Sequence, residues 1–302
     1  MAKPKNPLLS LGARGTIAKT LTFQKRGRGT IAREKPIPTD PYTLYQAYQR
    51  WDYRDYAYQW TLLPNSEKQV YRTRASRYHI TGFSQWMKEQ LKELPDLAGR
   101  WHLDEESGAT AYDSSKNNNN GVIVGASPAA GIIDGAYSFD GDHDQIDIPD
   151  HPTLQLPSAF TIEALIKASP PPSRTMILQK GAGGTAPWNY AWLLEPDNTA
   201  LFIVRNAANT ANFTQTFGVV ADGSWHHLLS TFNTTEMKTF VDGENINTRP
   251  TWQEAHTAPG HPFIIGFLWA TWYLGLIDEV RIYNRVLDPT EIKRHSERRY
   301  PP

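Results

Sequence analysis

The chain of 302 residues contains no cysteine. That absence excludes a disulfide-stapled scaffold, a thiolate metal site and a cysteine nucleophile. No apolar run approaches the roughly 18 residues that a membrane-spanning helix needs, so the sequence predicts no such helix. The first fifteen residues are basic but hold no continuous apolar stretch. We therefore expect no Sec-type leader and a protein that folds in the cytoplasm of the cell that makes it.

The whole chain also lacks a net charge, although its two halves are oppositely charged. The chain has 31 Lys and Arg and 31 Asp and Glu. Residues 1–98 hold 17 of the basic residues against 8 of the acidic ones, which leaves 14 against 23 for residues 99–302. Because the two halves carry charges of +9 and −9, we expect them to meet different partners.

Residues 1–38 form the first of three predicted domains, a basic arm. Its sequence repeats Arg-Gly-Thr-Ile-Ala at 14–18 and again at 28–32. The alternating residues of 16–23, followed by the glycines of 25–29, predict a β-hairpin. Since so small a hairpin is marginally stable alone, we expect it to lie on another structure.

Residues 39–96 form the second predicted domain, a helical module. The dipeptide at 40–41, Asp before Pro, is a helix start signal. Aromatic residues recur at near-helical spacing over 42–60, and two further helices are expected over 64–78 and 82–94. The sequence therefore predicts that this module is a small helical bundle with an aromatic core.

Residues 97–302 form the third predicted domain. Clusters of Gly, Pro, Asn and Asp separate short alternating runs there, and only 289–299 looks helical. The runs lie at 136–139, 145–148, 160–168, 201–204, 225–232, 237–241, 263–265 and 275–283. Many short strands with turn signals between them indicate an antiparallel sandwich or barrel. The chain is therefore expected to be mainly β.

Several motifs of this third domain occur in a fixed order. They are AGRWHLD at 98–104, DSS at 113–115, NNG at 119–121, AYSFDG at 136–141, IDIP at 146–149, FTIEA at 160–164, GSWHH at 223–227, FVDG at 240–243 and GLIDEVRIYN at 275–284. In these segments the domain resembles the laminin G-like, concanavalin A-like jelly rolls over about 200 residues. The resemblance implies an antiparallel jelly-roll sandwich, here preceded by the basic arm and the helical bundle.

The resemblance also implies a calcium ion that ties the N-terminal loop of the jelly roll to its last strand. The matching positions are Asp113, Asn119, Asp140 and Asp278. Calcium prefers six to eight oxygen ligands from carboxylates, amides and carbonyls. The alternative is that these are turn residues that satisfy backbone donors.

Catalysis is not expected. Glycoside hydrolysis needs two carboxylates beside the scissile bond, and the strand motif that supplies them in related glucanases, Glu-x-Asp-x-x-Glu, is missing. The sequence also has no nucleophile elbow and no phosphate-binding loop. The adjacent His226 and His227 are expected to face opposite sides of a strand, so they cannot share one metal ion.

Glycan binding is the function that the resemblance favours for the jelly roll. Aromatic rings stack on sugar rings, and the candidates are Trp188, Tyr190, Trp269 and Trp272. The alternative is that these rings are buried beneath the helical module or in an oligomer interface, where Trp and Tyr are also enriched.

The N-terminal half carries Gly-Thr-Ile-Ala at 15–18, Phe-Gln-Lys-Arg at 23–26 and Ile-Thr-Gly-Phe-Ser-Gln-Trp at 80–86. In these motifs and their spacing it resembles a module of phage and prophage structural proteins. We therefore expect a virion structural protein of a bacterial or archaeal virus, located at the virion surface as a homo-oligomer. Its partners would be other virion proteins through residues 1–96 and host cell-surface glycans through the jelly roll.

The predicted anchor is the hairpin, through Ile17, Leu21, Phe23, Arg26 and Arg28. Strand addition along its backbone edge would hold the protein in the particle, while the arginines steer the encounter. One alternative is a cellular surface adhesin or carbohydrate-binding protein exported without a Sec leader. Another is a DNA-binding protein, which rests on the basic half alone, and nucleic acid is not an expected partner.

Overall fold

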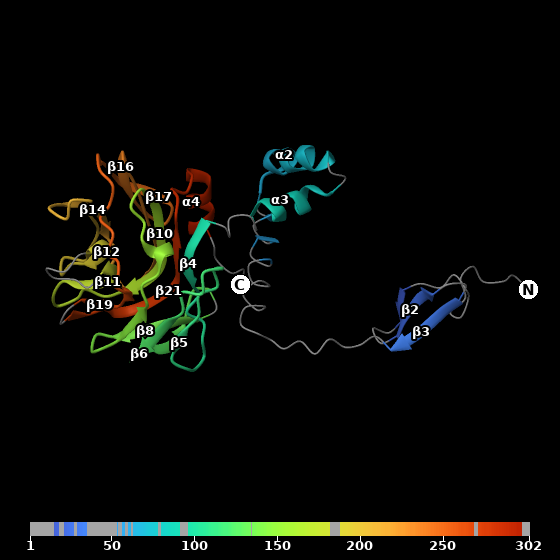
Figure 1. Cartoon of the computed structure of the whole chain (residues 1–302), viewed down its shortest axis with the longest axis horizontal. Coiled ribbons are helices and arrows are strands. Elements are labelled where there is room, and N and C mark those ends of the chain that lie inside the picture. Colours follow the sequence, from blue (N-terminus) through green and yellow to red (C-terminus); the bar gives the residue numbers. More distant parts are fainter. Residues whose placement is uncertain are drawn as a thin grey trace, which may run out of the picture. The chain divides into compact units, whose positions relative to one another are not determined.

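The chain divides into two compact units, Met1–Ala47 and Tyr48–Pro302. A computed structural model defines the structure (Figure 1). The residues that it describes are 15–17, 21–26, 29–34, 53, 56–57, 60–61, 63–77, 80–90, 96–133, 135–181, 188–268 and 271–297. Among the described helices, none is long and apolar enough to span a membrane.

The first unit contains three short strands. They are β1 (Gly15–Ile17), β2 (Leu21–Arg26) and β3 (Gly29–Glu34), which form an antiparallel sheet in that order. The sequence predicts a hairpin in this segment, and β2 pairs antiparallel with β3, from Leu21 opposite Glu34 to Arg26 opposite Gly29. Of the predicted anchor residues, Ile17 is on β1, and Leu21, Phe23 and Arg26 are on β2. Arg28 lies outside the described residues.

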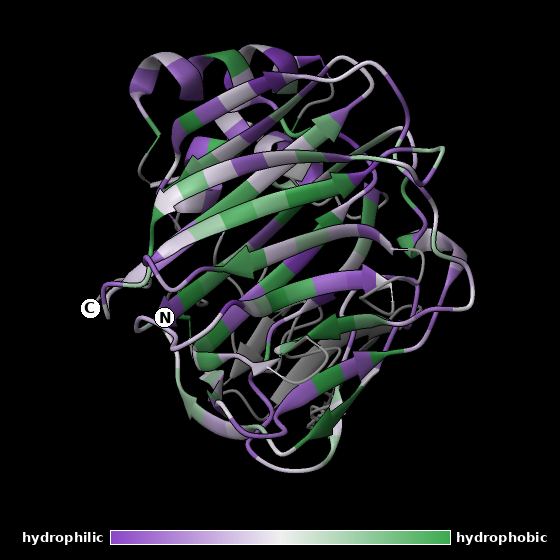
Figure 2. Ribbon diagram, turned by 90° about the vertical axis from the view of Figure 1, so that its left-hand side faces the viewer, coloured by the Kyte–Doolittle hydropathy of each residue, from purple (hydrophilic) through white to green (hydrophobic). Residues whose placement is uncertain are grey.

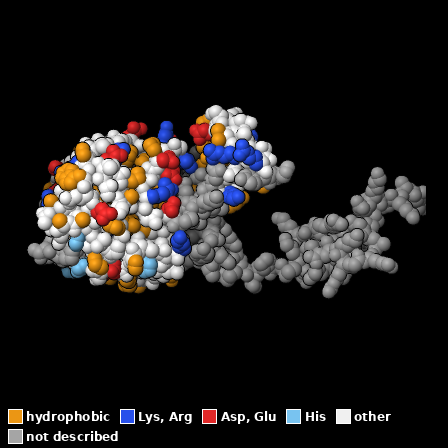
Figure 3. Space-filling view, turned by 45° about the horizontal axis from the view of Figure 1, so that its top comes forward, with side chains coloured by type: hydrophobic (Ala, Val, Ile, Leu, Met, Phe, Trp, Pro, Cys, Tyr) orange, Lys and Arg blue, Asp and Glu red, His pale blue; other side chains and the backbone are white. Residues whose placement is uncertain are grey.

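The second unit includes the helices α2 (Asn65–Ser76) and α3 (Gly82–Gln90), and the described residues at 53, 56–57 and 60–61 before them are also helical. Trp86 of α3 is buried in an apolar cluster that includes Tyr56 and Tyr71. Its indole Nε1 donates to the Tyr56 carbonyl at 3.1 Å. Tyr71 meets the Trp86 ring edge-on, with ring centroids 5.1 Å apart. The two helices lie within the ranges that the sequence predicts, 64–78 and 82–94. Aromatic residues at helical spacing share one face of a helix, and these faces form the contact. Figure 3 shows Lys and Arg side chains gathered over this helical pair.

The rest of the second unit is a sandwich of two antiparallel sheets (Figure 1). The sheet that we name after β10 runs β17 (Glu244–Pro250), β16 (Glu236–Val241), β15 (Trp225–Asn233), β10 (Ala159–Ala168), β21 (Leu274–Tyr283), β8 (Gly135–Asp140) and β7 (Ser127–Ala130), with β4 (Leu97–Trp101) also paired to β21. The sheet that we name after β12 runs β14 (Asn212–Val219), β13 (Thr199–Arg205), β12 (Trp188–Leu194), β11 (Thr175–Gly181), β18 (Phe263–Ile265), β9 (Gln145–Ile148), β6 (Gly121–Val124) and β5 (Thr110–Ala111). The predicted jelly-roll sandwich is confirmed.

Alternating hydropathy places the core between the two sheets (Figure 2). On β10, Phe160 and Ile162 point inward and are fully buried; on β12, Tyr190 and Trp192 do the same. The Phe160 ring lies 5.1 Å from the Tyr190 ring, across the two layers. Side chains at every second position thus fill the space between the sheets, as pleated strands require.

Three short elements complete the sandwich. They are η2 (Pro152–Leu154), the hairpin of β19 (Phe267–Leu268) with β20 (Thr271–Trp272), and helix α4 (Pro289–Ser296). Asp288 caps α4, since its carboxylate accepts from the backbone of Thr290 and Glu291. Helix α4 covers the outer face of the β10 sheet through Ile292, which joins an apolar cluster with Leu229 and Tyr283.

Candidate functional site

The outer face of the β12 sheet carries one continuous cross-strand row. Asp147 pairs with Ile264, Ile264 with Gln179, Gln179 with Ala191, and Ala191 with Ile203. Paired residues of neighbouring strands point to the same side of a sheet. Two polar side chains, Asp147 and Gln179, are therefore set into an apolar row on this face.

The apolar residues of that row belong to a larger apolar cluster, which forms the floor of this face. Its buried members are Met176, Ala191, Leu193 and Ile203, and Trp188 and Leu201 pack against them half-buried. The described residues of this cluster all belong to the β12 sheet itself, so no described helix takes part in it. We call this surface, with Gln179 and Asn189, the β12 face. An apolar floor with an indole beside it suits the C–H face of a sugar ring.

Asn189 is the one irregular position beside this floor. The pairing of β11 with β12 shifts between Gln179 and Gly181, which leaves an extra residue on β12 next to Asn189. The Asn189 side chain is fully buried, and neither its Nδ2 nor its Oδ1 has a hydrogen-bond partner. An unmade hydrogen bond of this kind costs roughly 1–3 kcal/mol, so a buried orphan amide calls for a bound partner such as a ligand or an ordered water. β-Bulges are frequent beside binding sites.

A second aromatic group lies at the β19–β20 hairpin. The Trp272 ring lies 4.2 Å from the His143 ring and 5.8 Å from the Phe267 ring, as centroid distances. The Gln179 Nε2 donates to the Phe267 carbonyl at 3.3 Å, which ties the hairpin to the cross-strand row. His143 is in turn hydrogen-bonded to the exposed Asp142 at 2.5 Å. A half-buried indole and a carboxylate therefore stand at the margin of the β12 face.

The four predicted glycan residues have different places. Trp188 and Trp272 are half-buried at the β12 face and its margin. Trp269 lies outside the described residues. The prediction is wrong for Tyr190, which is fully buried in the core between Phe160 and Phe263. Its alternation on β12 turns its ring inward, where it fills the sandwich and cannot meet a surface ligand.

The four predicted calcium ligands do not form one site. Asp140 lies opposite Leu274 on β21, whereas Asp278 lies opposite Leu165 on β10, four residues further along β21. That spacing separates the two positions by roughly 13 Å along the strand. Among the described residues, Asp113, Asp140 and Asp278 do not gather into a group that could share an ion.

Asp113 and Asn119 are instead residues that bind backbone groups of their own loop, which is the alternative to calcium binding that the sequence leaves open. The Asp113 carboxylate accepts from the backbone of Arg100, Ser115 and Asn119 at 2.8–2.9 Å. The Asn119 amide donates to the Ala98 carbonyl at 2.8 Å. Both side chains are buried and pin their loop to β4, and both oxygen atoms of the Asp113 carboxylate are already engaged.

Asp278 has neighbours that the sequence analysis did not foresee. His102, Asp104 and Glu279 each offer a ligand atom, and these atoms lie within 4.8 Å of one another. Asp278 is fully buried beside them; its Oδ2 accepts from the backbone of Ile132 and Ile133 at 3.1 Å, and its Oδ1 has no partner. Burial raises the pKa of Asp278 well above its usual range, and the charges of Glu279 and Asp104 raise it further.

Glu279 has the opposite electrostatic character. Burial alone would raise its pKa, but Arg281, His102 and Arg100 together hold the pKa of Glu279 well below its usual range. Its carboxylate contacts the His102 Nδ1 and the Arg281 guanidinium, and the Arg100 Nη2 lies 3.6 Å away. Since two guanidinium groups already neutralise Glu279, a cation at this group would find its carboxylate ligands on the side of Asp278 and Asp104.

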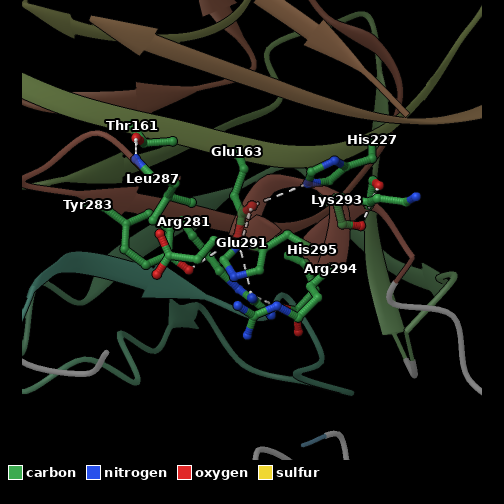
Figure 4. Close-up of polar contacts among 12 residues, drawn as sticks. Thr161, Glu163, His227, Arg281, Tyr283, Leu287, Glu291, Lys293, Arg294 and His295 are labelled. Carbon is green, nitrogen blue, oxygen red and sulfur yellow. Dashed lines mark hydrogen bonds and ion pairs between the residues drawn. The ribbon is translucent and has the colours of Figure 1, made fainter. Parts of the chain in front are cut away.

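Glu163 is the centre of a second buried network, shown in Figure 4. Its Oε2 lies 2.8 Å from the His295 Nδ1 and 3.3 Å from the His227 Nε2. Its Oε1 accepts from Arg281 and from the Tyr283 hydroxyl, both at 3.3 Å. Burial raises the pKa of Glu163, yet the His295 charge and its other partners hold that pKa well below its usual range. This network joins α4 to β10, β15 and β21.

The two adjacent histidines contact different partners, as the strand geometry predicts. His226 is hydrogen-bonded to Asp242 at 2.8 Å and to Asp222 at 3.2 Å, near the surface. His227 is buried and faces Glu163. The two rings therefore belong to opposite faces of β15 and do not share an ion.

The comparisons with known proteins agree with this architecture. Residues 139–293 match the family model of the concanavalin A-like lectin/glucanases superfamily. The binding domain of Paraclostridial Mosquitocidal Protein 1 is similar in structure, with a TM-score of 0.57 and 13% identity over 68% of this chain and 52% of that one. This chain therefore spans about half the length of that domain. No curated protein matches the sequence.

Two further similar structures contain sugars. Domain 4 of AbnA, an extracellular arabinanase from Geobacillus stearothermophilus, was solved in complex with arabinotriose; its TM-score is 0.55, with 21% identity over 67% of this chain and 98% of that domain. The ligand-binding domain of botulinum neurotoxin serotype D was solved with N-acetylneuraminic acid; its TM-score is 0.53, with 12% identity over 68% and 52% of the two chains. At these identities the likeness establishes a shared fold. With the family model matching half of its length, the chain belongs to the concanavalin A-like lectin/glucanases superfamily.

Proposed function

We propose that this chain is a non-enzymatic carbohydrate-binding protein that takes a glycan on the β12 face. The observation that carries the proposal is the fully buried, unpartnered amide of Asn189 beside the indole of Trp188. Because Asn189 is fully buried, a sugar hydroxyl would satisfy that amide only after the side chains that cover it move on binding. The ring's C–H face would then lie on the indole and the apolar floor. Gln179 and Asp147 would contact hydroxyl groups further along the row.

The sugar-bound relatives support the ligand class. AbnA domain 4 has nearly the length of the present sandwich and was solved with arabinotriose, and the neurotoxin domain was solved with N-acetylneuraminic acid. We propose from them that this chain also binds an oligosaccharide. For the β12 face the neutral arabinotriose is the better probe, because Asp147 is the only charged member of its cross-strand row.

The absence of catalysis is part of the proposal. Hydrolysis needs a pair of carboxylates about 5–9.5 Å apart across the scissile bond. Among the paired residues of the described cross-strand row, Asp147 stands without a second carboxylate. This supports binding without bond cleavage, which incubation with arabinotriose followed by product analysis would test.

The binding test compares three variants by isothermal titration with arabinotriose. Trp188→Ala and Asn189→Leu should each lower the affinity at least tenfold, since one removes the stacking ring and the other the unpartnered amide beside it. Trp252→Ala is the matched control, because this indole is 67% exposed and packs on Phe213 outside the β12 face. Equal binding by all three variants would contradict the proposed face.

We further propose that residues 1–96 attach this domain to a larger assembly, which the sequence resemblance implies to be the particle of a prokaryotic virus. The support is the excess of positive charge in residues 1–98 and the separate compact unit Met1–Ala47. Mass spectrometry of purified particles against host envelope fractions distinguishes a virion protein from a cellular adhesin. Replacing Ile17, Leu21 and Phe23 by Ser should abolish incorporation, whereas Arg26→Ala with Arg28→Ala should only reduce it.

A calcium ion bound beside Asp278 is the last part of the proposal. The unpartnered Oδ1 of Asp278 and the carboxylate of Asp104 are oxygen ligands of the kind that calcium prefers. We propose that these two residues hold the ion that the sequence analysis assigned to Asp113, Asn119, Asp140 and Asp278. When bound, it would neutralise the buried carboxylates at the junction of the segment after β4 with β21.

A further inference from the structure

A cleft of about 430 Å³ opens beside the start of β4, away from the residues of the β12 face. Its floor is apolar, formed by Leu97 and Leu156, which are 4% and 5% exposed. Its rim is polar and includes Lys116, Asn117 and Asn284. The described lining contains no carboxylate. The volume falls within the usual range of small-molecule sites, about 300–1,000 Å³.

One wall of this cleft is held rigidly by hydrogen bonds. The Asn117 Nδ2 donates to the carbonyls of Leu97 at 2.8 Å and Ala98 at 3.0 Å. Asp113 fixes the same loop through the backbone of Ser115 and Asn119. Because the wall is fixed before a ligand arrives, binding would cost little conformational entropy.

The polar groups of the rim are available to a ligand. Both hydrogen bonds of the Asn117 side chain use Nδ2, which leaves its Oδ1 to accept from a hydroxyl group. Lys116 is exposed and forms no ion pair with any described residue. An exposed ammonium group in the lining of a cleft with an apolar floor, and no carboxylate among the described lining residues, favours a ligand that joins an apolar surface to a negative charge.

We infer that this cleft is a second glycan subsite, specific for an acidic sugar such as a uronic or sialic acid unit. The sugar's carboxylate would pair with Lys116, its hydroxyl groups with Asn117 and Asn284, and its C–H face with Leu97 and Leu156. The inference rests on the proposed function for the class of ligand, but it shares no residue with the β12 face. A neutral sugar would lose the ion pair and bind more weakly.

The test is isothermal titration of the full chain with glucuronic acid, N-acetylneuraminic acid and glucose. The acidic sugars should bind about tenfold more tightly than glucose, and their affinity should fall as salt is added. Lys116→Gln should lower the affinity for both acidic sugars about tenfold, the loss expected for one charge-assisted hydrogen bond. Lys238→Gln is the matched control, since Lys238 pairs with Glu236 at 2.6 Å and lies outside the cleft.

The outcomes separate this inference from the proposed function. Glucuronic acid that binds no better than glucose, or equally to the wild type and Lys116→Gln, overturns the subsite. If instead Asn189→Leu abolishes acidic-sugar binding and Lys116→Gln does not, the acidic sugar belongs on the β12 face and the subsite is again overturned. Arabinotriose binding lost with Asn189→Leu, while acidic sugars still bind that variant normally, supports both sites. Failure of arabinotriose to bind, with Lys116-dependent binding of acidic sugars, overturns the β12 face alone.

Discussion

The His295 Nδ1 lies 2.8 Å from the Glu163 Oε2, and this contact joins α4, near the C-terminus, to the middle of the β10 sheet. Both side chains are 3% exposed. His227, Arg281 and Tyr283 also contact the carboxylate (Figure 4). Because the charge is buried, its partners determine whether it stabilises the sandwich or destabilises it.

The first prediction concerns the removal of this charge. Glu163→Gln should destabilise the protein by about 3–5 kcal/mol, since Arg281 and the histidines would be left without their buried anion. Urea unfolding followed by circular dichroism measures the change. Glu236→Gln, which removes the surface partner of Lys238, is the control and should change stability by less than about 1 kcal/mol. Equal stability of the two variants would count against a structural role for the network.

The second prediction concerns the pH dependence of stability. The pKa of Glu163 is well below its usual value near 4.5, so the folded state releases this proton more readily than the unfolded state. Its contribution is therefore complete above about pH 4.5 and is lost as the pH falls toward the lowered pKa. Unfolding free energies measured between pH 3 and 7 should decrease below about pH 4.5 in the wild type. The decrease should be shallower in Glu163→Gln, and parallel curves would contradict the prediction.

The third prediction separates a calcium-bound Asp278 from a protonated one. At a calcium concentration 100-fold above Kd, binding should add about 2.7 kcal/mol, a rise in Tm of roughly 5 °C or more. Asp278→Asn should lose this response, and in EDTA it should be at least as stable as the wild type, because it removes a buried carboxylate whose pKa is raised. Asp113→Asn should keep the response while losing stability through its loop hydrogen bonds. Identical melting with calcium and with EDTA would leave Asp278 as a protonated structural residue.

The strands that the sequence predicts well are those with one clear alternation. The runs over 160–168 and 275–283 agree within a residue with β10 and β21, which form the centre of their sheet. The strands β11 and β12 were missed, and every described residue of β11 is buried. In their sequences, TMILQKG and WNYAWLL, polar and apolar residues do not alternate, as is common for strands that are covered on both faces, so the period of two is missing.

The proposed calcium site was predicted only in part, because tertiary packing determines which carboxylates meet. Asp278 was identified, but its neighbour is Asp104 and not Asp113. The pairing of Trp101 with Val280 determines this arrangement, because it brings the segment after β4 alongside Glu279. A register between strands some 180 residues apart is set by tertiary packing, which the local sequence does not encode. The acidic dipeptide of Asp104 and Glu105, directly after the predicted first strand, was the available signal.

The last prediction tests whether Tyr190 belongs to the core or to the ligand site. Its hydroxyl is fully buried without a hydrogen-bond partner, and burial raises the pKa of this hydroxyl far above its usual value of 10.0. Tyr190→Phe removes the unpartnered hydroxyl and keeps the ring that packs on Phe160, so stability should stay equal or rise by about 1 kcal/mol. Arabinotriose affinity should be unchanged, because no part of the side chain reaches the β12 face. Tyr190→Ala, by contrast, should destabilise the sandwich by about 3–5 kcal/mol through the cavity that it leaves. A Tyr190→Phe protein with normal stability but tenfold weaker glycan binding would return Tyr190 to the ligand site.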